Sequence, residues 1–114
     1  LKEDAGFACR VRRVIETSHP FPPKLARVAS TLYVSERTLK RRLQEEEASF
    51  QALVDQVRLE RARDLLASTT MNLSQIADSL GYADAANFTR AFKRWTGLSP
   101  SHFRNRELQT AETA

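Results

Sequence analysis

Apolar residues recur three or four positions apart along most of the chain, which is the spacing of one face of an α-helix. No segment of the sequence alternates between apolar and polar residues as a half-buried strand does. Pro20, Pro22 and Pro23 interrupt the pattern early, and short Ser/Thr or Gly turns interrupt it later. We therefore predict an all-α fold of about seven helices. The expected helices include residues 11–15, 24–32, 36–45, 50–67, 73–80, 85–96 and 100–106.

Residues suited to helix ends support these boundaries. Ser35 and Asp84 each precede a predicted helix and are good N-caps, because their side-chain oxygens accept hydrogen bonds from free N–H groups. Asn72, with Gln75 three residues later, has the form of a capping box. Gly81 fits the position just after a helix, where a left-handed residue is common.

The chain contains an internal repeat. With an offset of 48 residues, positions 25, 28, 29 and 32 fall on 73, 76, 77 and 80. Past the next turn the offset becomes 49, and positions 35, 39, 41 and 43 fall on 84, 88, 90 and 92. Each copy is thus a short helix, a tight turn and a capped second helix, as in a helix-turn-helix. The alternative is a repeated helical hairpin that binds no ligand.

The repeat and the helix lengths predict four parts along the chain. These are an N-terminal helix with the first helix-turn-helix at 1–48, a linker helix at 49–67, the second helix-turn-helix at 68–107 and a flexible tail at 108–114. A linker of this length spans about 27 Å. It would hold the two second helices near one turn of DNA apart, about 34 Å. Because the chain begins with Leu1, we expect it to be a piece of a longer protein.

Composition narrows the class of protein. The chain has 114 residues, about one small domain, and its 41% of apolar residues suffices for a modest core. The single cysteine, Cys9, excludes an internal disulfide and fits a reducing compartment. No apolar run approaches the length of a membrane span and no signal peptide is visible, so we predict a cytoplasmic protein that does not enter a membrane.

Basic residues gather in two places. Eighteen Lys and Arg against fourteen Asp and Glu give a net charge of +4. Residues 37–42 hold four basic side chains, and residues 85–106 hold five and no acidic one. Such patches suggest a polyanionic partner, the alternative being two solvated helix faces.

The second helix of each copy carries an apolar stripe and a separate polar stripe. At helical spacing, Leu39 and Leu43 point inward in the first copy. The apolar stripe of the second copy consists of Phe88, Ala91, Phe92 and Trp95. The polar stripes are Arg37, Lys40, Arg41 and Gln44, and Ala86, Thr89, Arg90 and Lys93. Arg and Lys pair with guanine edges, while Thr and Ala contact the thymine methyl group. For each arginine, base contact, phosphate contact and simple solvation stay open.

Nothing in the sequence points to catalysis. His19 and His102 have no metal-ligand spacing with Cys9, and no Ser/His/Asp order or glycine-rich phosphate loop stands out. We predict no enzyme activity, no metal and no cofactor.

The stretch from Leu25 to Arg106 resembles the DNA-binding domain of AraC/XylS-type transcription regulators. The blocks that carry the resemblance are RTLKRRL (37–43), SFQALVDQVRLERARDLL (49–66), LSQIADSLGY (73–82) and NFTRAFKRWTGLSP (87–100), with Phe103 and Arg104 just after. The resemblance implies two homeodomain-like helix-turn-helix units joined by a long helix, binding to double-stranded promoter DNA, and transcription control at a bacterial nucleoid. It also implies a separate N-terminal regulatory domain, through which a small-molecule effector would act, and RNA polymerase as a partner.

Carried over by position, the resemblance also implies a set of DNA-binding residues. Together with the N-cap Ser35 and the stripe residue Gln44, the candidate set is Ser35, Glu36, Arg37, Lys40, Arg41, Gln44, Ala85, Ala86, Thr89, Arg90 and Lys93. The family often has Gly where this chain has Ala48, which predicts a less sharp turn before the linker helix. It often has polar residues in place of Ala85 and Ala86, so the second unit is expected to rely more on Arg90 and backbone contacts.

Three functions compete at this point. The leading one is sequence-specific binding of double-stranded DNA by a transcription regulator. The others are a helical module that docks acidic protein partners and a nonspecific nucleic-acid binder. The sequence leaves open the operator, the effector, and whether the intact protein activates or represses.

Overall fold

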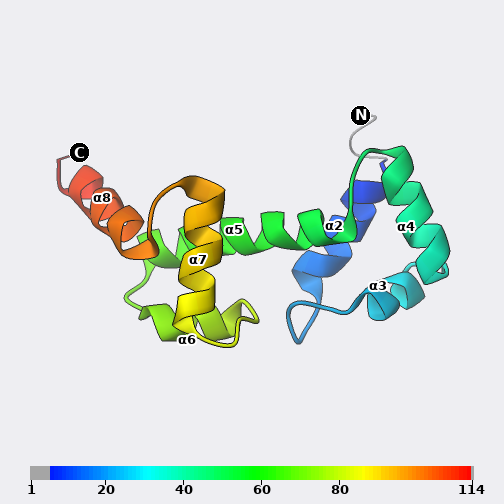
Figure 1. Cartoon of the computed structure of the whole chain (residues 1–114), viewed down its shortest axis with the longest axis horizontal. Coiled ribbons are helices and arrows are strands. Elements are labelled where there is room, and N and C mark those ends of the chain that lie inside the picture. The colour runs from blue at the N-terminus through cyan, green and yellow to red at the C-terminus, as the bar shows by residue number, and fades with distance from the viewer. Residues whose placement is uncertain (1–5, 114) are drawn as a thin grey trace. The chain divides into compact units, whose positions relative to one another are not determined.

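The computed structural model describes residues 6–113, and side chains from 6 to 109. Within that range the chain forms seven α-helices and no strand, so the all-α prediction is confirmed. The helices are α2 (Phe7–Thr17), α3 (Leu25–Thr31), α4 (Glu36–Glu45), α5 (Phe50–Ser68), α6 (Leu73–Ser79), α7 (Ala85–Thr96) and α8 (Pro100–Thr113) (Figure 1).

The predicted N-caps are confirmed. The side chain of Ser35 accepts a hydrogen bond from the Thr38 N–H at 3.0 Å and begins α4. Asp84 accepts from the Asn87 N–H at 2.8 Å and begins α7. Asn72 closes its capping box reciprocally with the residue three positions later, at 2.8 and 2.9 Å. These bonds satisfy N–H groups that have no partner within their own helix.

The last helix is longer than predicted. Instead of ending near Arg106, α8 continues to Thr113, through most of the segment expected to be a tail. Residues 107–113 contain neither Gly nor Pro, and Glu, Leu, Gln and Ala among them are good helix formers. Nothing in the sequence therefore stops the helix, and its intrinsic propensity decides the outcome.

The chain divides into two compact units, and the division falls inside α5, between Val57 and Arg58. The expected boundaries at residues 48 and 67 mark the ends of α5, but the contacts change from one unit to the other in the middle of it. The predicted linker helix thus contributes one half to each unit.

In the first unit, α2, α3, α4 and the first half of α5 surround one core. Val11 and Ile15 of α2 and Val28 of α3 are completely buried. The remaining members of this core are Phe7, Ala29, Leu39, Leu43, Leu53, Val54 and Val57. Each apolar stripe points inward, as burial of apolar area favours.

In the second unit, the other half of α5 packs with α6, α7 and α8. Ala62 and Leu66 of α5 and Ile76 of α6 are 0–1% exposed. A row of aromatic rings crosses this unit, with centroids 5.5–5.9 Å apart. The rings are those of Tyr82, Phe88, Phe92 and Phe103. Tilted and edge-on contacts of this kind add to the stability that burial supplies.

The structural repeat is longer than the sequence repeat. The second half of α5 precedes α6 as α2 precedes α3. Each of the two helical segments places a pair of apolar residues four positions apart in its core: Val11 and Ile15 in α2, Ala62 and Leu66 in α5. The start of α5 likewise matches the start of α8, where Ser49 and Ser99 accept from the N–H three residues later. Each unit is therefore a four-helix arrangement in which α5 is shared.

The turn between the two helices of each helix-turn-helix has the same geometry but a different residue. Gly81 has φ +86° in the second unit, and Tyr33 has φ +59° at the matching position of the first. The next N–H closes each turn, from Val34 to the Ala29 carbonyl at 3.0 Å and from Tyr82 to the Ala77 carbonyl at 2.9 Å. A non-glycine residue in the left-handed region costs roughly 1–2 kcal/mol.

Tyr33→Gly is expected to stabilise the first unit by up to about 1 kcal/mol. The Tyr33 side chain is 95% exposed, so its removal costs little packing and relieves the left-handed strain. Urea unfolding of the purified chain checks the change. Tyr33→Ala, which removes the ring but keeps Cβ, serves as the control and should gain nothing.

The turn before α5, where the resemblance predicts a less sharp bend at Ala48, closes through a backbone hydrogen bond. The Ala48 N–H donates to the Leu43 carbonyl at 2.9 Å, which closes a tight helix end. The left-handed residue is Glu47, with φ +57°, one position before Ala48. In the second unit Gly97, with φ +83°, ends α7 in the left-handed region.

Candidate nucleic-acid interface

The polar stripe of α4 is exposed, as its spacing predicts. Leu39 and Leu43 are 0% and 1% exposed and hold the opposite face in the core. Every predicted contact residue of this helix lies on the exposed side: Ser35, Glu36, Arg37, Lys40, Arg41 and Gln44. The Ser35 hydroxyl is already engaged, because it accepts from the Thr38 N–H and donates to the Thr38 hydroxyl. The arginines and Lys40 are the side chains of this face with the greatest reach.

On α7 the polar stripe is narrower. Phe88 and Phe92 are completely buried, whereas Ala86, Arg90 and Lys93 are exposed. Ala85 and Thr89, also predicted as contact residues, are only half-exposed at the edge of the stripe. Arg90 and Lys93 are therefore the long, exposed side chains of this face.

One of the basic residues counted in the sequence pattern packs within the first unit instead. The Arg42 guanidinium lies 4.0 Å from the centroid of the Phe7 ring. A guanidinium over an aromatic face is a stabilising cation–π contact. Arg42 is half-buried, so its charge belongs to the packing of α4 against α2 and not to the exposed stripe.

Two more arginines act within the second unit. The Nε of Arg58 donates to the Leu80 carbonyl at 2.9 Å, and its guanidinium lies 4.5 Å from the Tyr82 ring centroid. Arg104 donates to the carbonyl oxygens of Leu65, Leu66, Thr69 and Met71, at 2.6–3.2 Å. The last carbonyls of a helix have no partner within it, so Arg58 caps the end of α6 and Arg104 caps the end of α5.

A carboxylate joins α4 to α2 in the first unit. The two oxygens of Glu46 accept from the N–H groups of Phe7 and Ala8, at 2.8 and 3.0 Å. These two hydrogen bonds, with a smaller contribution from the Arg42 charge, lower the pKa of Glu46. Both favour the ionised carboxylate, which also suits the positive end of the α2 dipole.

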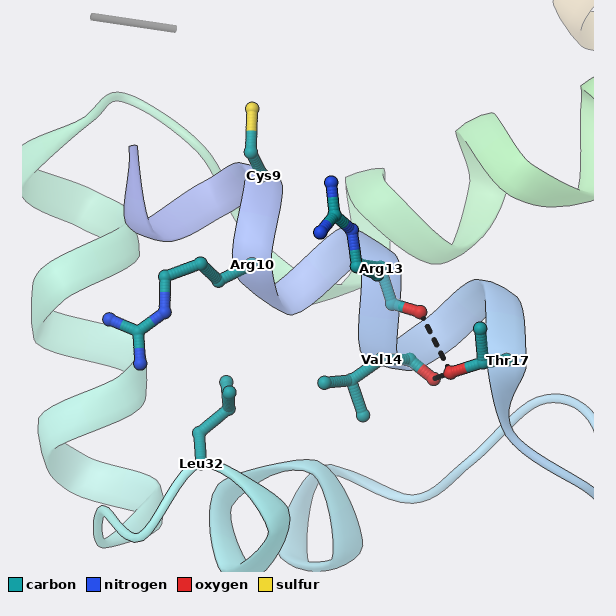
Figure 2. Close-up of a pocket in the computed structure, with 6 residues that line it drawn as sticks. All are labelled: Cys9, Arg10, Arg13, Val14, Thr17 and Leu32. Carbon is teal, nitrogen blue, oxygen red and sulfur yellow. Dashed lines mark hydrogen bonds between the residues drawn. The ribbon is translucent and has the colours of Figure 1, made fainter. Parts of the chain in front are cut away.

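A groove of about 460 Å³ lies on the first unit, away from the predicted contact residues (Figure 2). It is lined by Cys9, Arg10, Arg13, Val14 and Thr17 of α2 and by Leu32. The Thr17 hydroxyl is used within the helix, where it donates to the Arg13 carbonyl at 3.0 Å. The groove is open to solvent and has no convergent set of polar groups.

Among residues 6–113, no group of three or more His, Cys, Asp and Glu side chains has the proximity to hold a metal ion. In the same part of the chain, no helix has both the length and the apolar character needed to cross a membrane.

The sequence pattern predicted the exposed faces but missed three side chains that cap helices or join them. Arg58, Arg104 and Glu46 bind carbonyls or N–H groups more than 20 residues away in sequence. No local spacing predicts such bonds, because the partner is set by how the helices pack. A fourth residue, Asn87, was overlooked because its role as a partner of Arg90 depends on a side-chain conformation.

The geometry defines a class of protein: tandem helix-turn-helix units that share one long helix and expose the polar face of each second helix. The family model described as "Helix-turn-helix domain" matches residues 28–106. The chain belongs to this AraC-type helix-turn-helix family, which confirms the resemblance drawn from its sequence blocks.

Similar proteins agree with this assignment. The HTH-type transcriptional regulator VqsM of Pseudomonas aeruginosa is 38% identical over 103 residues, which are 90% of this chain and 32% of that protein. Among solved structures, a DNA-binding transcriptional dual regulator from Escherichia coli K-12 has a TM-score of 0.86 and 32% identity, over 91% of this chain and 94% of that one. The transcriptional regulator CdpR from Pseudomonas aeruginosa has a TM-score of 0.83 and 38% identity, over 91% and 33%. The chain thus spans only part of VqsM and CdpR.

Proposed function

We propose that this chain binds double-stranded DNA sequence-specifically and regulates transcription as the DNA-binding part of a longer protein. One observation carries the proposal: α4 and α7 each bury an apolar face and leave an Arg- and Lys-bearing face exposed. The Escherichia coli neighbour, described as a DNA-binding transcriptional regulator and covered over 94% of its chain, supports it.

The exposed side chains have complementary tasks. Arg41 and Arg90 are the candidates for reading guanine, because a guanidinium reaches the O6 and N7 acceptors in the major groove together. Lys40 and Lys93 suit phosphates, where a flexible ammonium needs no fixed direction. Ala86 supplies a methyl group for contact with thymine. The second unit then reads bases chiefly through Arg90.

The length of α5 leads to a prediction about the DNA site. Its 19 residues span about 28 Å. We propose that α4 and α7 enter successive major grooves on one face of the duplex, with centres about 10–10.5 base pairs apart. A duplex bends where the protein spacing falls short of one full turn, so the site is expected to favour deformable steps between its halves.

A selection from mixed genomic fragments, with competitor DNA and at several salt concentrations, tests the function. Sequence-specific binding gives a preferred site that survives competitor. Steep salt dependence without preference would instead identify a nonspecific binder. No measurable affinity at physiological salt would favour a module that docks acidic proteins, and would overturn the proposal.

Arg41→Ala is expected to relax base preference at one position of the selected site and to weaken binding by about 1–3 kcal/mol. Competition titrations with single-base variants of the site measure this. Arg63→Ala, an exposed arginine on α5 outside the contact set, is the control. An equal loss on every sequence would make Arg41 a phosphate contact and not a base reader.

Further partners belong to the intact protein. A regulator of this kind acts at a promoter in the bacterial cytoplasm, where the bound chain stands beside RNA polymerase. A small-molecule effector acts through a separate regulatory domain, since this chain spans about a third of the length of its curated relatives, 32% in the case of VqsM. Transcription assays with the intact protein and RNA polymerase, in the presence and absence of candidate effectors, test the polymerase partner and the effector.

A further inference from the structure

The two matched arginines of the exposed stripes have different partners on their own helices. Arg41 donates from Nη1 to Oε2 of Glu45 at 3.3 Å, one helical turn toward the C-terminus. Arg90 donates from Nη2 to Oδ1 of Asn87, three residues toward the N-terminus. The repeat places Arg41 and Arg90 at equivalent positions, so their different partners can be compared directly.

The partner of Arg41 competes with DNA. Both side chains of the Arg41–Glu45 pair are more than 60% exposed, and such pairs contribute little in water. The Glu45 carboxylate also neutralises the guanidinium and repels phosphates. The contact is a single hydrogen bond of 3.3 Å between two exposed side chains, so it gives Arg41 no firmly preformed orientation for DNA.

The partner of Arg90 does not compete. Asn87 is neutral, and its amide oxygen uses one of the five N–H donors of the guanidinium. Four N–H donors remain for the O6 and N7 acceptors of a guanine, and the full positive charge of Arg90 remains. Asn87 is itself held in place. Its backbone N–H donates to the side chain of the N-cap Asp84 at 2.8 Å, and Asn87 is half-buried.

We propose that Asn87 is a positioning residue that sets the base specificity of the second unit by orienting Arg90. This inference rests on the proposed DNA-binding function and deepens it. Ala85 and Ala86 offer no side-chain hydrogen bonds, so α7 relies chiefly on Arg90 to read bases through hydrogen bonds. A guanidinium held in one direction loses less conformational freedom on binding than a free one, and discriminates more strongly between bases.

The test uses the full chain and the DNA site selected by it, with every base pair varied in turn. Asn87→Ala is expected to reduce discrimination three- to tenfold at the position where Arg90→Ala abolishes it, and nowhere else. In the double variant, Asn87→Ala should add nothing to the loss from Arg90→Ala. Asn105→Ala, an exposed asparagine of α8, is the control, and thermal melting verifies that each variant folds.

Asn87→Asp separates positioning from simple contact. The carboxylate would hold Arg90 as well as the amide does but would cancel its charge, so affinity is expected to fall at least tenfold with the order of base preference kept. The proposal is overturned if Asn87→Ala leaves every base preference unchanged, or if its effect and that of Arg90→Ala are additive. A wild-type chain that selects no site would overturn the proposed function itself, and this inference with it.

Discussion

Phe92→Ala is expected to destabilise the protein by about 3–5 kcal/mol, a large fraction of the stability of a small domain. Phe92 is completely buried, and its ring lies 5.8 Å from that of Phe88 and 5.5 Å from that of Phe103. Truncation removes the apolar burial and both ring contacts and leaves a cavity in the core. Equilibrium unfolding in urea measures the loss.

The repeat offers a matched comparison for this result. Leu43 holds the equivalent place in α4 and is 1% exposed, so Leu43→Ala is expected to cost about 2–5 kcal/mol. Leu108→Ala, at a position 51% exposed, should change stability by less than about 0.5 kcal/mol. Unchanged unfolding of Phe92→Ala would show that α7 does not bury this face.

Arg104→Met is expected to destabilise the protein by about 2–4 kcal/mol, although it exchanges a charged residue for an apolar one of similar length. The guanidinium supplies hydrogen bonds to four carbonyl oxygens at the end of α5 and in the turn after it. Methionine keeps the packing of the side-chain stem but removes the guanidinium donors, including those of the part-buried bonds to the Leu66 and Met71 carbonyls. Thermal and urea unfolding give the loss.

Two further variants test whether the several N–H donors of the Arg104 guanidinium are needed for stability. Arg104→Lys keeps the charge, but one ammonium cannot span the four carbonyls, so it should recover less than half of the loss. Arg94→Met removes an exposed arginine of α7 and should have almost no effect on stability. Equal behaviour of Arg104→Met and Arg94→Met would contradict the capping role.

The sequence predicted the features whose causes are local. Apolar spacing gave the helices, and short-range chemistry gave the caps at Ser35, Asn72 and Asp84, because each of these bonds joins residues three positions apart. The exposed stripes of α4 and α7 followed from the same periodicity. An internal repeat strengthened both, since two copies with one pattern rarely arise from chance spacing.

Features that depend on packing were not predictable in this way. The charge pattern counted Arg42 and Arg104 with the exposed basic patches, yet the first lies over Phe7 and the second caps α5. Charge counting treats every arginine alike, whereas the fold decides which ones are already engaged. The division of α5 between two cores was missed because its apolar residues were read as one stripe: the buried residues of the first half end at Val57, and those of the second half begin five positions later, at Ala62, on another face of the helix.

Because α5 contributes to both cores, neither helix-turn-helix unit can be excised from the chain without cutting this helix. A fragment that stopped at Val57 would keep only eight residues of α5, and their helical form would depend on the packing of Leu53, Val54 and Val57 in the first core. A fragment that began at Arg58 would lose the first eight residues of α5 in the same way. To transfer one helix-turn-helix unit into another protein, a designer would therefore have to include the whole of α5. The half of α5 that then lacks its own core would need a new apolar surface to pack against.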